Sequence, residues 1–366
     1  TLFPYTTLFR SIIYFMCYGN ILPISHQNDN DDYCTFTDLV DGKISFDDFD
    51  TFCIIDKVPD ENELYKIVEF VCSNGKNIIC VEEEYLDQIE KICKRYNVKL
   101  LQCNYETIEI PEKKWNYDSE IIGIDIPVVA VMGIGQNVQK FDLQLYLRSR
   151  FIDKGYKVSQ IGTKKISGLF GLHPLPDFLF NTQYSDVDKV YAFNRVMKDV
   201  SMQEKPDVIL LGIPDSLLPL NNKHRFSFGL YAYEIFNAVQ PDFVITSLMA
   251  NDGYNDEFYS EISKMAKYKY NVNIDAYFVS QFCPLSNSIW SEKLSYVYLP
   301  RMELPKTEYK VYTTSDLNND ILFKHCRARD CPQGYVGPVC GIPSIPPVRI
   351  YIRGWYRCRS RFGSPQ

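Results

Sequence analysis

The chain has 366 residues, and its 39 Lys and Arg against 46 Asp and Glu give a formal net charge of −7. That length is typical of two domains, and the 46% hydrophobic content is enough to build packed cores. An acidic chain lacks the positive surface that nucleic acid or anionic lipid would require, and no apolar run reaches the roughly 18 residues of a membrane span. The composition therefore predicts no nucleic-acid partner and no membrane-spanning segment.

Both ends of the chain differ from the rest of it. Residues 1–11, TLFPYTTLFRS, back-translate codon for codon into a common short-read sequencing adapter, so we expect them to be an artefact. Residues 326–366 use arginine and no lysine, whereas the preceding part is rich in lysine. This change predicts an out-of-frame or disordered tail. We expect no metal site there, because the gaps between its cysteines match no zinc-binding spacing.

The first predicted domain, residues 12–120, alternates short apolar runs with segments of helical period. The predicted strands are 12–17, 51–56, 77–81 and 98–102, and the predicted helices are 60–74 and 83–96. This alternation is typical of a parallel α/β sheet, so we expect a small Rossmann-like domain. The polar stretch 110–120 is interpreted as the linker at the end of this domain.

Cysteine usage indicates a reducing compartment. No CxxC pair occurs, and most cysteines before residue 326 lie inside apolar runs. Buried free thiols in the cytoplasm are the simplest account of this pattern. The cysteines concerned are Cys17, Cys34, Cys53, Cys72, Cys80, Cys93, Cys103 and Cys283.

The second predicted domain, residues 121–325, repeats the alternation on a larger scale. Its predicted helices are 141–154, 186–204, 226–239 and 256–269. Its predicted strands are 127–132, 157–161, 207–212, 242–248 and 274–279, with 296–299 as an edge strand. Continuous apolar strands such as VVAVM favour a mostly parallel sheet that is covered on both faces.

The loop after the first strand of this second domain is the most informative segment of the chain. In MGIGQNVQKF, a glycine turn leads to a lysine that opens a helix, which is the strand–loop–helix order of a phosphate-binding P-loop. Backbone N–H groups of such loops surround phosphate oxygens at a helix N-terminus, and the lysine reaches the outer phosphates. The predicted phosphate-binding residues are Gly133, Gly135, Gln136, Asn137, Gln139 and Lys140.

Two residues depart from the P-loop pattern. Gln139 stands where a glycine is expected, and Phe141 stands where a serine or threonine would ligate Mg²⁺. A phenylalanine cannot ligate a metal ion. We expect Phe141 to begin an apolar helix face that packs on the sheet, with Leu145 and Ile152 on it and Leu143, Leu147 and Phe151 beside it.

Three interpretations of the loop remain open on sequence alone. It could belong to an active ATPase or GTPase with an unusual metal ligand. It could bind a nucleotide or another anion without hydrolysis. It could also be a purely structural turn with Lys140 solvated. A dinucleotide site is disfavoured, because G-x-G-x-x-G would need a glycine at Val138.

The turn after strand 207–212 carries further candidate groups. Ligands of doubly wound sheets lie at the carboxyl ends of strands, so this turn could face the same crevice as Lys140. Asp215 is a weak catalytic candidate that could orient a water or a metal ion. The other polar residues that could face this crevice are Asn221, Asn222, Lys223, His224 and Arg225. Turn chemistry alone also explains Asp215, Asn221 and Asn222, and we favour that account. His173 is expected to be a packed, hydrogen-bonded side chain rather than a general base.

The segments that carry these groups resemble a known family. Residues 128–164, 169–180 and 206–248 are similar to the peptide maturation system proteins of clostridial gene cassettes for ribosomally made, bacteriocin-type peptides. The distinctive piece is the G-x-G-x-x-x-x-K-F loop, here Gly133, Gly135, Lys140 and Phe141. The resemblance spans about residues 12–298. It implies a degenerate P-loop-like domain and an accessory protein that works beside a peptide-modifying enzyme and an exporter, but it implies no reaction.

The favoured prediction is a cytoplasmic accessory factor in the maturation of a modified peptide. It would bind a nucleotide, ATP or GTP, or another phosphate ligand through the 133–140 loop, and its partner would be the precursor peptide or the modifying enzyme. One alternative is an active ATPase or GTPase that drives maturation or export. The other is a non-enzymatic scaffold for the same partners. The sequence leaves enzymatic activity and oligomeric state open.

Overall fold

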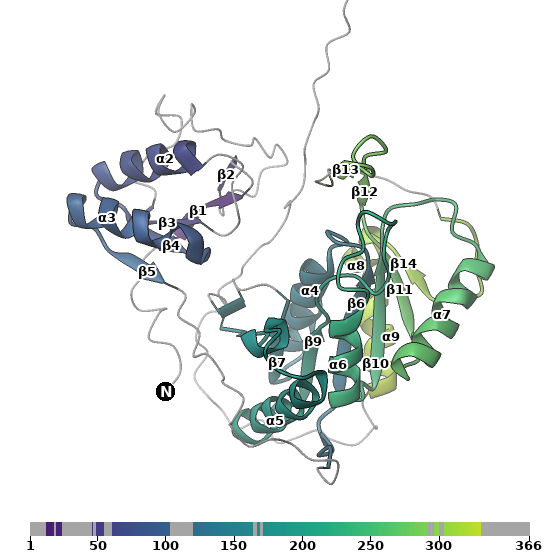
Figure 1. The fold of residues 1–366 in the computed structure, drawn as a ribbon. Coiled ribbons are helices and arrows are strands. Elements are labelled where there is room, and N and C mark those ends of the chain that lie inside the picture. The colour runs from purple at the N-terminus through teal and green to yellow at the C-terminus, as the bar shows by residue number, and fades with distance from the viewer. Residues whose placement is uncertain are drawn as a thin grey trace, which may run out of the picture. The chain divides into compact units, whose positions relative to one another are not determined.

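The computed structural model describes residues 12–17, 20–23, 46, 49–54, 61–102, 120–163, 167–168, 171–291, 294, 296–299 and 304–330. These residues form two compact units (Figure 1). Unit 1 contains the described residues up to 102, and unit 2 contains most of those from 120 onward. The expected artefact at residues 1–11, nearly all of the expected linker and residues 331–366 lie outside the described residues.

Unit 1 is a small α/β sheet with the strand order β2-β1-β3-β4-β5. All neighbouring strands are parallel except β1 and β2. The helices α2 and α3 pack over one apolar core with the strands, and β3-α2-β4-α3-β5 corresponds to one half of a Rossmann sheet. The elements are β1 (Ile12–Cys17), β2 (Asn20–Pro23), β3 (Thr51–Ile54), α2 (Glu61–Ser73), β4 (Asn77–Cys80), η2 (Glu83–Tyr85), α3 (Leu86–Tyr96) and β5 (Leu100–Gln102).

The cysteines described in the core of unit 1 are buried free thiols, as predicted. They are Cys53, Cys72, Cys80 and Cys93. The Sγ atoms of Cys72 and Cys93 lie 3.9 Å apart, where α2 and α3 meet. The apolar runs that contain these residues therefore build the core, and the thiols behave as small hydrophobic side chains.

Unit 2 is built on a seven-stranded sheet with the order β14-β11-β10-β6-β9-β7-β8. Every neighbouring pair in this sheet is parallel, so the predicted α/β class with a mostly parallel sheet is confirmed. The strands are β6 (Val128–Ile134), β7 (Val158–Gly162), β8 (His173–Pro174), β9 (Val208–Gly212), β10 (Phe243–Leu248), β11 (Ala276–Val279) and β14 (Val311–Tyr312).

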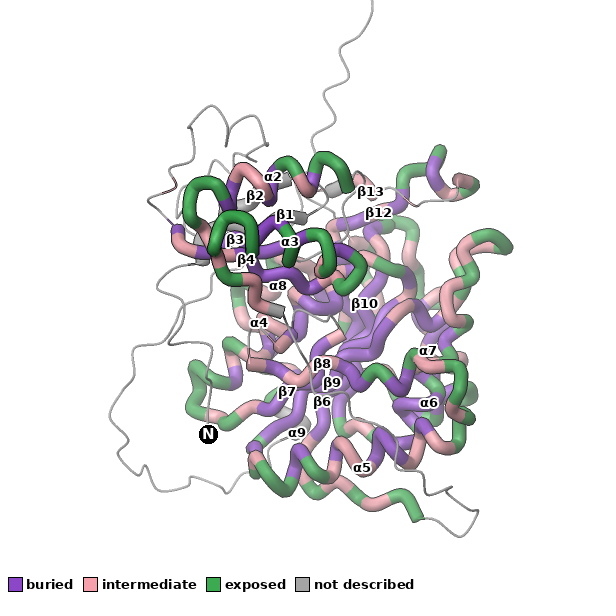
Figure 2. The backbone as a smooth tube through the Cα atoms, turned by 60° about the vertical axis from the view of Figure 1, so that its left-hand side comes forward, coloured by how far each residue is buried: buried purple, intermediate pink, exposed green. Residues whose placement is uncertain are grey.

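Helices cover both faces of this sheet (Figure 1). Alternate residues of β6 point to opposite faces, because the side-chain period of a strand is two. Val128, Ala130 and Met132 pack toward α5 (Asp186–Glu204) and α6 (Leu230–Ala238). Val129 and Val131 pack toward α4 (Lys140–Asp153) and α9 (Ile321–Asp330). The central strands are thus buried on both sides, which Figure 2 shows as purple tube. The remaining helices are η4 (Asp177–Phe180), α7 (Asp256–Tyr270) and α8 (Thr314–Asn318).

Two predicted elements differ from the structure. The predicted edge strand 296–299 is wrong for the main sheet: β13 (Tyr296–Tyr298) pairs antiparallel with β12 (Phe282–Pro284), and β14 forms the edge instead. The helix predicted from residue 226 begins only at Leu230. The cause is local, since Phe226 and Phe228 have φ angles of 52° and 55°, which an α-helix cannot accommodate.

The apolar face of α4 packs on the sheet as predicted for most of its residues, but Ile152 is not part of it. Leu143, Leu147 and Phe151, which follow one another at four-residue spacing, form the core contacts. Phe141 is buried as expected, but Ile152 is 49% exposed. A spacing of four places residues on one face of a helix, whereas Ile152 lies about 100° around the axis from Phe151.

The expected tail boundary after residue 325 falls inside α9. Leu322, Phe323 and Cys326 are at most 2% exposed and pack with Phe151 of α4 and Phe243 of β10. Residue 326 therefore belongs to the packed core of unit 2. Within the described part of the chain, no helix has both the length and the apolar character needed to cross a membrane.

Candidate phosphate-binding site

The candidate site lies where the strand order of unit 2 reverses. The chain passes from β6 through α4 to β7 on one side of β6, and later from β9 to β10 on the other side. Such a reversal opens a crevice at the carboxyl ends of the strands involved. Hydrogen bonds join the loops there: Leu217 N–H donates to the Gly133 carbonyl over 3.0 Å, and the Ser247 hydroxyl donates to the Val138 carbonyl.

The backbone φ angles of the 133–140 loop alternate in sign. Gly135, Asn137 and Gln139 have φ angles of 112°, 54° and 58°, whereas the residues between them have negative φ. Alternation of this kind turns successive N–H groups toward one side and forms an anion-binding nest. Apart from the Gly135 N–H, which donates to Ser216 Oγ over 2.7 Å, the loop amides are available: among the described residues, no protein acceptor pairs with the backbone N–H groups of 136–140.

Gly135 is required by its φ angle of 112°, and Gly133 by space. A Cβ atom on Gly133 would lie 2.8 Å from Val138 Cγ2, 2.9 Å from Lys140 Cδ and 3.0 Å from the Ser247 carbonyl oxygen. A Cβ atom on Gly135 would in addition displace the end of the Met249 side chain, which would lie 2.2 Å away. The loop consequently folds back over the end of β6 and lays the stem of Lys140 against Gly133.

Lys140 is the first residue of α4, and it is buried, with 9% of its surface exposed. Its ammonium donates to the backbone carbonyl of Asp215. Burial lowers the pKa of Lys140 to about 8, and the negative charge of Asp215 opposes this shift. An ammonium has three donors, and one protein carbonyl satisfies only one of them. The structural interpretation with Lys140 solvated does not fit this geometry.

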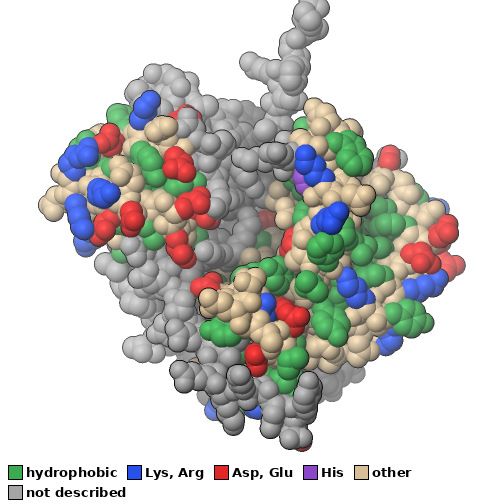
Figure 3. All heavy atoms as spheres, in the orientation of Figure 1, with side chains coloured by type: hydrophobic (Ala, Val, Ile, Leu, Met, Phe, Trp, Pro, Cys, Tyr) green, Lys and Arg blue, Asp and Glu red, His purple; other side chains and the backbone are tan. Residues whose placement is uncertain are grey.

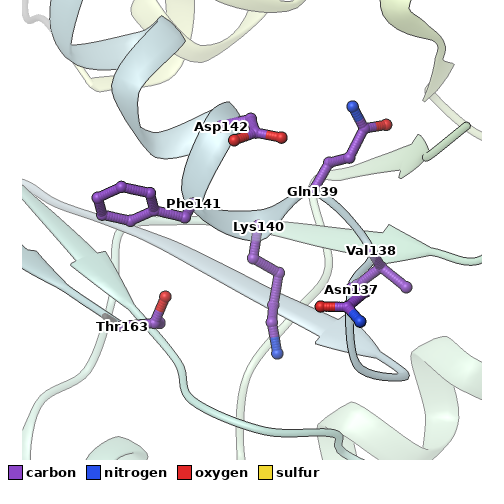
Figure 4. Close-up of a pocket in the computed structure, with 7 residues that line it drawn as sticks. All are labelled: Asn137, Val138, Gln139, Lys140, Phe141, Asp142 and Thr163. Carbon is purple, nitrogen blue, oxygen red and sulfur yellow. The ribbon is translucent and has the colours of Figure 1, made fainter. Parts of the chain in front are cut away.

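A hollow with a volume of about 70 Å³ lies against the helix start. Figure 4 shows Lys140 and Gln139 leaving the helix start in opposite directions, with Asn137 on the loop beside them. This volume is well below the roughly 300–1,000 Å³ of pockets that enclose drug-sized ligands. Its lining residues are Asn137, Val138, Gln139, Lys140, Phe141, Asp142 and Thr163.

Both departures from the P-loop pattern have a local explanation. Gln139 keeps the left-handed conformation that a glycine would supply, and its Oε1 accepts from the Gln281 N–H over 2.8 Å. That bond ties the loop to the segment after β11 and compensates for the backbone strain. Phe141 is 6% exposed and lies close to Gly162 of β7, where a Cβ would be 3.2 Å from its ring. An apolar ring therefore occupies the position of the usual metal ligand.

Asp215 is the one candidate of the β9 turn that the structure brings to Lys140. Besides the carbonyl that accepts from Lys140, its carboxylate accepts from Gln136 Nε2 over 3.1 Å and from the Ser227 N–H over 2.7 Å. Both carboxylate oxygens are thus engaged in holding the turn. This arrangement suits a positioning residue better than a catalytic base.

The other predicted polar residues of that turn, all within the described part of the chain, form no hydrogen bond with Lys140, and two of them instead join the turn to residues 289 and 290. Asn221 Oδ1 accepts from the N–H groups of Lys223 and His224, each over 2.8 Å, which is an Asx turn. The Asn221 amide and the Lys223 ammonium donate to the carbonyls of Ile289 and Trp290. None of these side chains lines the hollow beside Lys140.

His173 lies on β8, outside the hollow beside Lys140. Its Nε2 lies 2.5 Å from Glu204 Oε1, so it is hydrogen-bonded as predicted. It is not packed in an apolar loop, because its side chain is 43% exposed.

Sequence reasoning missed four residues that complete the site. Ser216 and Ser247 hold the loop backbone, Gln281 holds Gln139, and Thr163 lines the hollow. Thr163, Ser247 and Gln281 lie at or just beyond the carboxyl end of a strand. That position is the signal that could have drawn attention to them. Their meeting depends on strand order, which the sequence pattern does not reveal.

Comparisons with known proteins give only distant structural likenesses. The sequence matches no protein-family model, and a search of curated proteins gave no match. A DUF1611 family protein from Anabaena variabilis has a TM-score of 0.42 at 12% identity, over 63% of this chain and 68% of that one. The signal recognition particle receptor FtsY from Elizabethkingia anophelis, in complex with GDP, has a TM-score of 0.27 at 16% identity, over 60% and 70%.

A GTPase from Pyrococcus abyssi in its apo form has a TM-score of 0.25 at 12% identity, over 42% of this chain and 66% of the GTPase. The chain thus spans just under two thirds of that protein. All three TM-scores lie below 0.5, a level at which a shared fold is not established. The P-loop-like α/β fold of unit 2 therefore rests on its own strand order and on its strand–loop–helix unit.

Proposed function

We propose that unit 2 binds the phosphate group of a small ligand, such as a nucleotide, through the 133–140 loop. The observation that carries the proposal is the buried ammonium of Lys140, whose charge burial disfavours and which has one acceptor among the residues that the structure describes. A phosphate at the helix start would supply further acceptors and a negative charge. The nest of the same loop adds the backbone N–H groups of residues 136–140.

Phe141 favours binding without metal-dependent hydrolysis. A P-loop normally holds Mg²⁺ through the residue after its lysine, and here that residue is a buried phenylalanine. The Asp215 carboxylate, the other candidate ligand, already accepts two hydrogen bonds. We therefore expect an affinity for phosphate that Mg²⁺ does not increase.

Calorimetry on the full chain tests the proposal. ATP, GTP, pyrophosphate and inorganic phosphate would each be titrated with and without Mg²⁺. We expect at least one of them to bind, and Lys140→Met to weaken that binding by more than about tenfold, or 1.4 kcal/mol. Lys154→Met, at the exposed C-terminal end of the same helix, is the matched control and should bind like the wild type. Equal affinities of wild type and Lys140→Met would refute the proposal.

The same titrations separate the two alternatives. Phosphate release that needs Mg²⁺ and disappears in Lys140→Met would identify an active ATPase or GTPase. If none of the four ligands binds, the non-enzymatic scaffold is the remaining alternative. The favoured outcome is binding without turnover, because the loop offers N–H groups and an ammonium to an anion and has an apolar residue at the metal position.

We further propose that the phosphate-binding unit serves an accessory role in the maturation of a ribosomally made peptide. Its support is the resemblance of residues 128–248 to the peptide maturation system proteins, together with the retained loop. Deleting the gene in its host and measuring the mass of the mature peptide would test this role. An unchanged mass and yield of the peptide would rule it out.

A further inference from the structure

One face of unit 2 carries exposed apolar side chains around the start of α6. Phe228, Leu230 and Tyr233 are 47%, 54% and 48% exposed, and Phe180 of η4 is 43% exposed. We call these four residues the α6 surface. Figure 3 shows hydrophobic side chains gathered over this part of unit 2. Exposed apolar side chains that gather in this way mark interaction sites more often than scattered ones do.

These residues all lie on or beside the N-terminal half of α6. Leu230 and Tyr233 lie three positions apart on α6, on the side opposite the buried Ile235. The ring of Phe180 lies 5.0 Å from that of Tyr231, edge to face, so η4 packs beside the first turn of α6. Phe228 directly precedes the helix N-cap.

The backbone before α6 is strained, and the burial of the Phe228 side chain is too small to offset that strain. Phe226, Phe228 and Gly229 have φ angles of 52°, 55° and 76°. A left-handed conformation is unfavourable for a bulky residue and is found mostly at functional sites. Phe228 adopts it and nevertheless remains half exposed. The strain presents this ring to solvent instead of packing it into the core.

The Lys269 ammonium adjoins Phe228, and the Arg225 guanidinium lies nearby along the chain, where its Nε donates to the Asn222 carbonyl over 2.8 Å. Lys269 Nζ donates to the Phe228 carbonyl over 2.6 Å, and the Phe228 N–H donates to the Arg225 carbonyl over 3.3 Å. Both charged residues are exposed, on a chain whose net charge is −7. A basic rim beside aromatic side chains is complementary to carboxylates that flank an apolar anchor.

We propose that the α6 surface docks an acidic peptide segment that carries aromatic or large aliphatic anchors. The anchors would cover Leu230, Tyr233 and Phe180, and the carboxylates of the segment would pair with Arg225 and Lys269. This inference does not depend on phosphate binding. The two sites are nevertheless adjacent, because the Ser227 N–H donates to Asp215, whose carbonyl accepts from Lys140.

A labelled random copolymer of glutamate and tyrosine is the probe, with fluorescence anisotropy on the full chain as the measurement. We expect saturable binding of this copolymer, and much weaker binding of polyglutamate and of a lysine–tyrosine copolymer. The double variant Leu230→Ser/Tyr233→Ser and the variant Arg225→Glu should each weaken binding by about tenfold or more. Tyr268→Ser, an 86% exposed tyrosine on α7, is the matched control and should bind like the wild type.

Three results would overturn the proposal. Wild type and double variant could bind the copolymer equally, while a thermal melt shows that both are folded. Polyglutamate could bind as well as the copolymer, which would leave no role for the anchors. Saturating inorganic phosphate could displace the copolymer, which would place the glutamates in the 133–140 loop. The last result would refute this surface while supporting the phosphate site.

Discussion

Lys140 combines a stability cost with the proposed function in one residue. Below pH 8 its ammonium stays protonated in the folded chain although burial disfavours the charge. The difference between a pKa of 10.5 and one of about 8 corresponds to roughly 3 kcal/mol of destabilisation. A cost of this size is typical of a binding site, where stability is given up for a charge that a ligand will later use.

Lys140→Met should therefore raise the free energy of unfolding by about 1–3 kcal/mol at pH 7. The size of this gain depends on pH. Between pH 8 and 10.5 the folded wild type has released a proton that the unfolded chain still binds, so its stability rises and the advantage of the variant shrinks. Urea unfolding of both proteins at pH 7 and pH 10 measures this. A difference that stays constant between the two pH values would argue against a buried, protonated Lys140.

At the scale of elements, α9 shows that packing extends past the expected boundary of the domain. Leu322 is fully buried against the α4 side of the sheet, whereas its neighbour Ile321 is 43% exposed. Leu322→Ala should lower the free energy of unfolding by about 2–5 kcal/mol, because it leaves a cavity in the core. Ile321→Ala on the same helix should cost less than about 1 kcal/mol. Equal effects in urea titrations would mean that α9 does not pack on the sheet.

A buried ion pair joins α5 and α6. Lys189 Nζ lies 3.3 Å from Glu234 Oε1, and the two side chains are 8% and 4% exposed. Burial raises the pKa of Glu234 to about 7, and the charge of Lys189 opposes this shift. Removing one partner of such a pair strongly lowers the free energy of unfolding, because the remaining charge stays buried without a partner.

The Glu234 carboxyl should make stability fall as the pH rises from 4.5 to about 7. In this window the folded chain holds a proton that the unfolded chain has already released. Glu234→Gln cannot titrate, so its stability should lack this contribution. Thermal unfolding of both proteins between pH 5 and 7 would show the difference between them changing with pH, and a constant difference would contradict the prediction.

At the scale of the whole molecule, the two units have separate apolar cores. Each core contains at least one cysteine whose reactivity can show when that unit unfolds. Cys53, Cys72, Cys80 and Cys93 lie in the core of unit 1, and Cys326 lies in that of unit 2. Among the six cysteines whose burial the structure describes, Cys283 alone is only partly buried. Burial raises its pKa, which keeps the thiolate scarce and its reaction slow.

Iodoacetamide labelling with peptide mapping should therefore modify Cys283 before the five buried thiols. In a urea series the four thiols of unit 1 should become reactive together, with a midpoint that differs from that of Cys326, because separate cores unfold as separate cooperative units. A single common midpoint for all five thiols would show that the units unfold as one.

Much of the fold could be read from local patterns. Apolar runs and helical spacing placed β6, β9, β10, α5 and α7 to within a few residues, because the side-chain periods of strands and helices are properties of the local chain. Short elements such as β12, β14 and α8 were missed, since two to five residues carry no clear period. The start of α6 was missed because no residue pattern before it predicts a left-handed backbone conformation at Phe226 and Phe228.

The sequence by itself determined the α/β class, the strand–loop–helix unit and the placement of Lys140 at a helix start. Tertiary structure alone decided that β9 and β10 flank β6, so that a carbonyl 75 residues away meets the Lys140 ammonium and a serine 109 residues away holds the loop. The physical reason is that periodicity reflects which face of an element is buried. Which elements become neighbours depends on the packing free energy of the whole sheet, and no short segment encodes it.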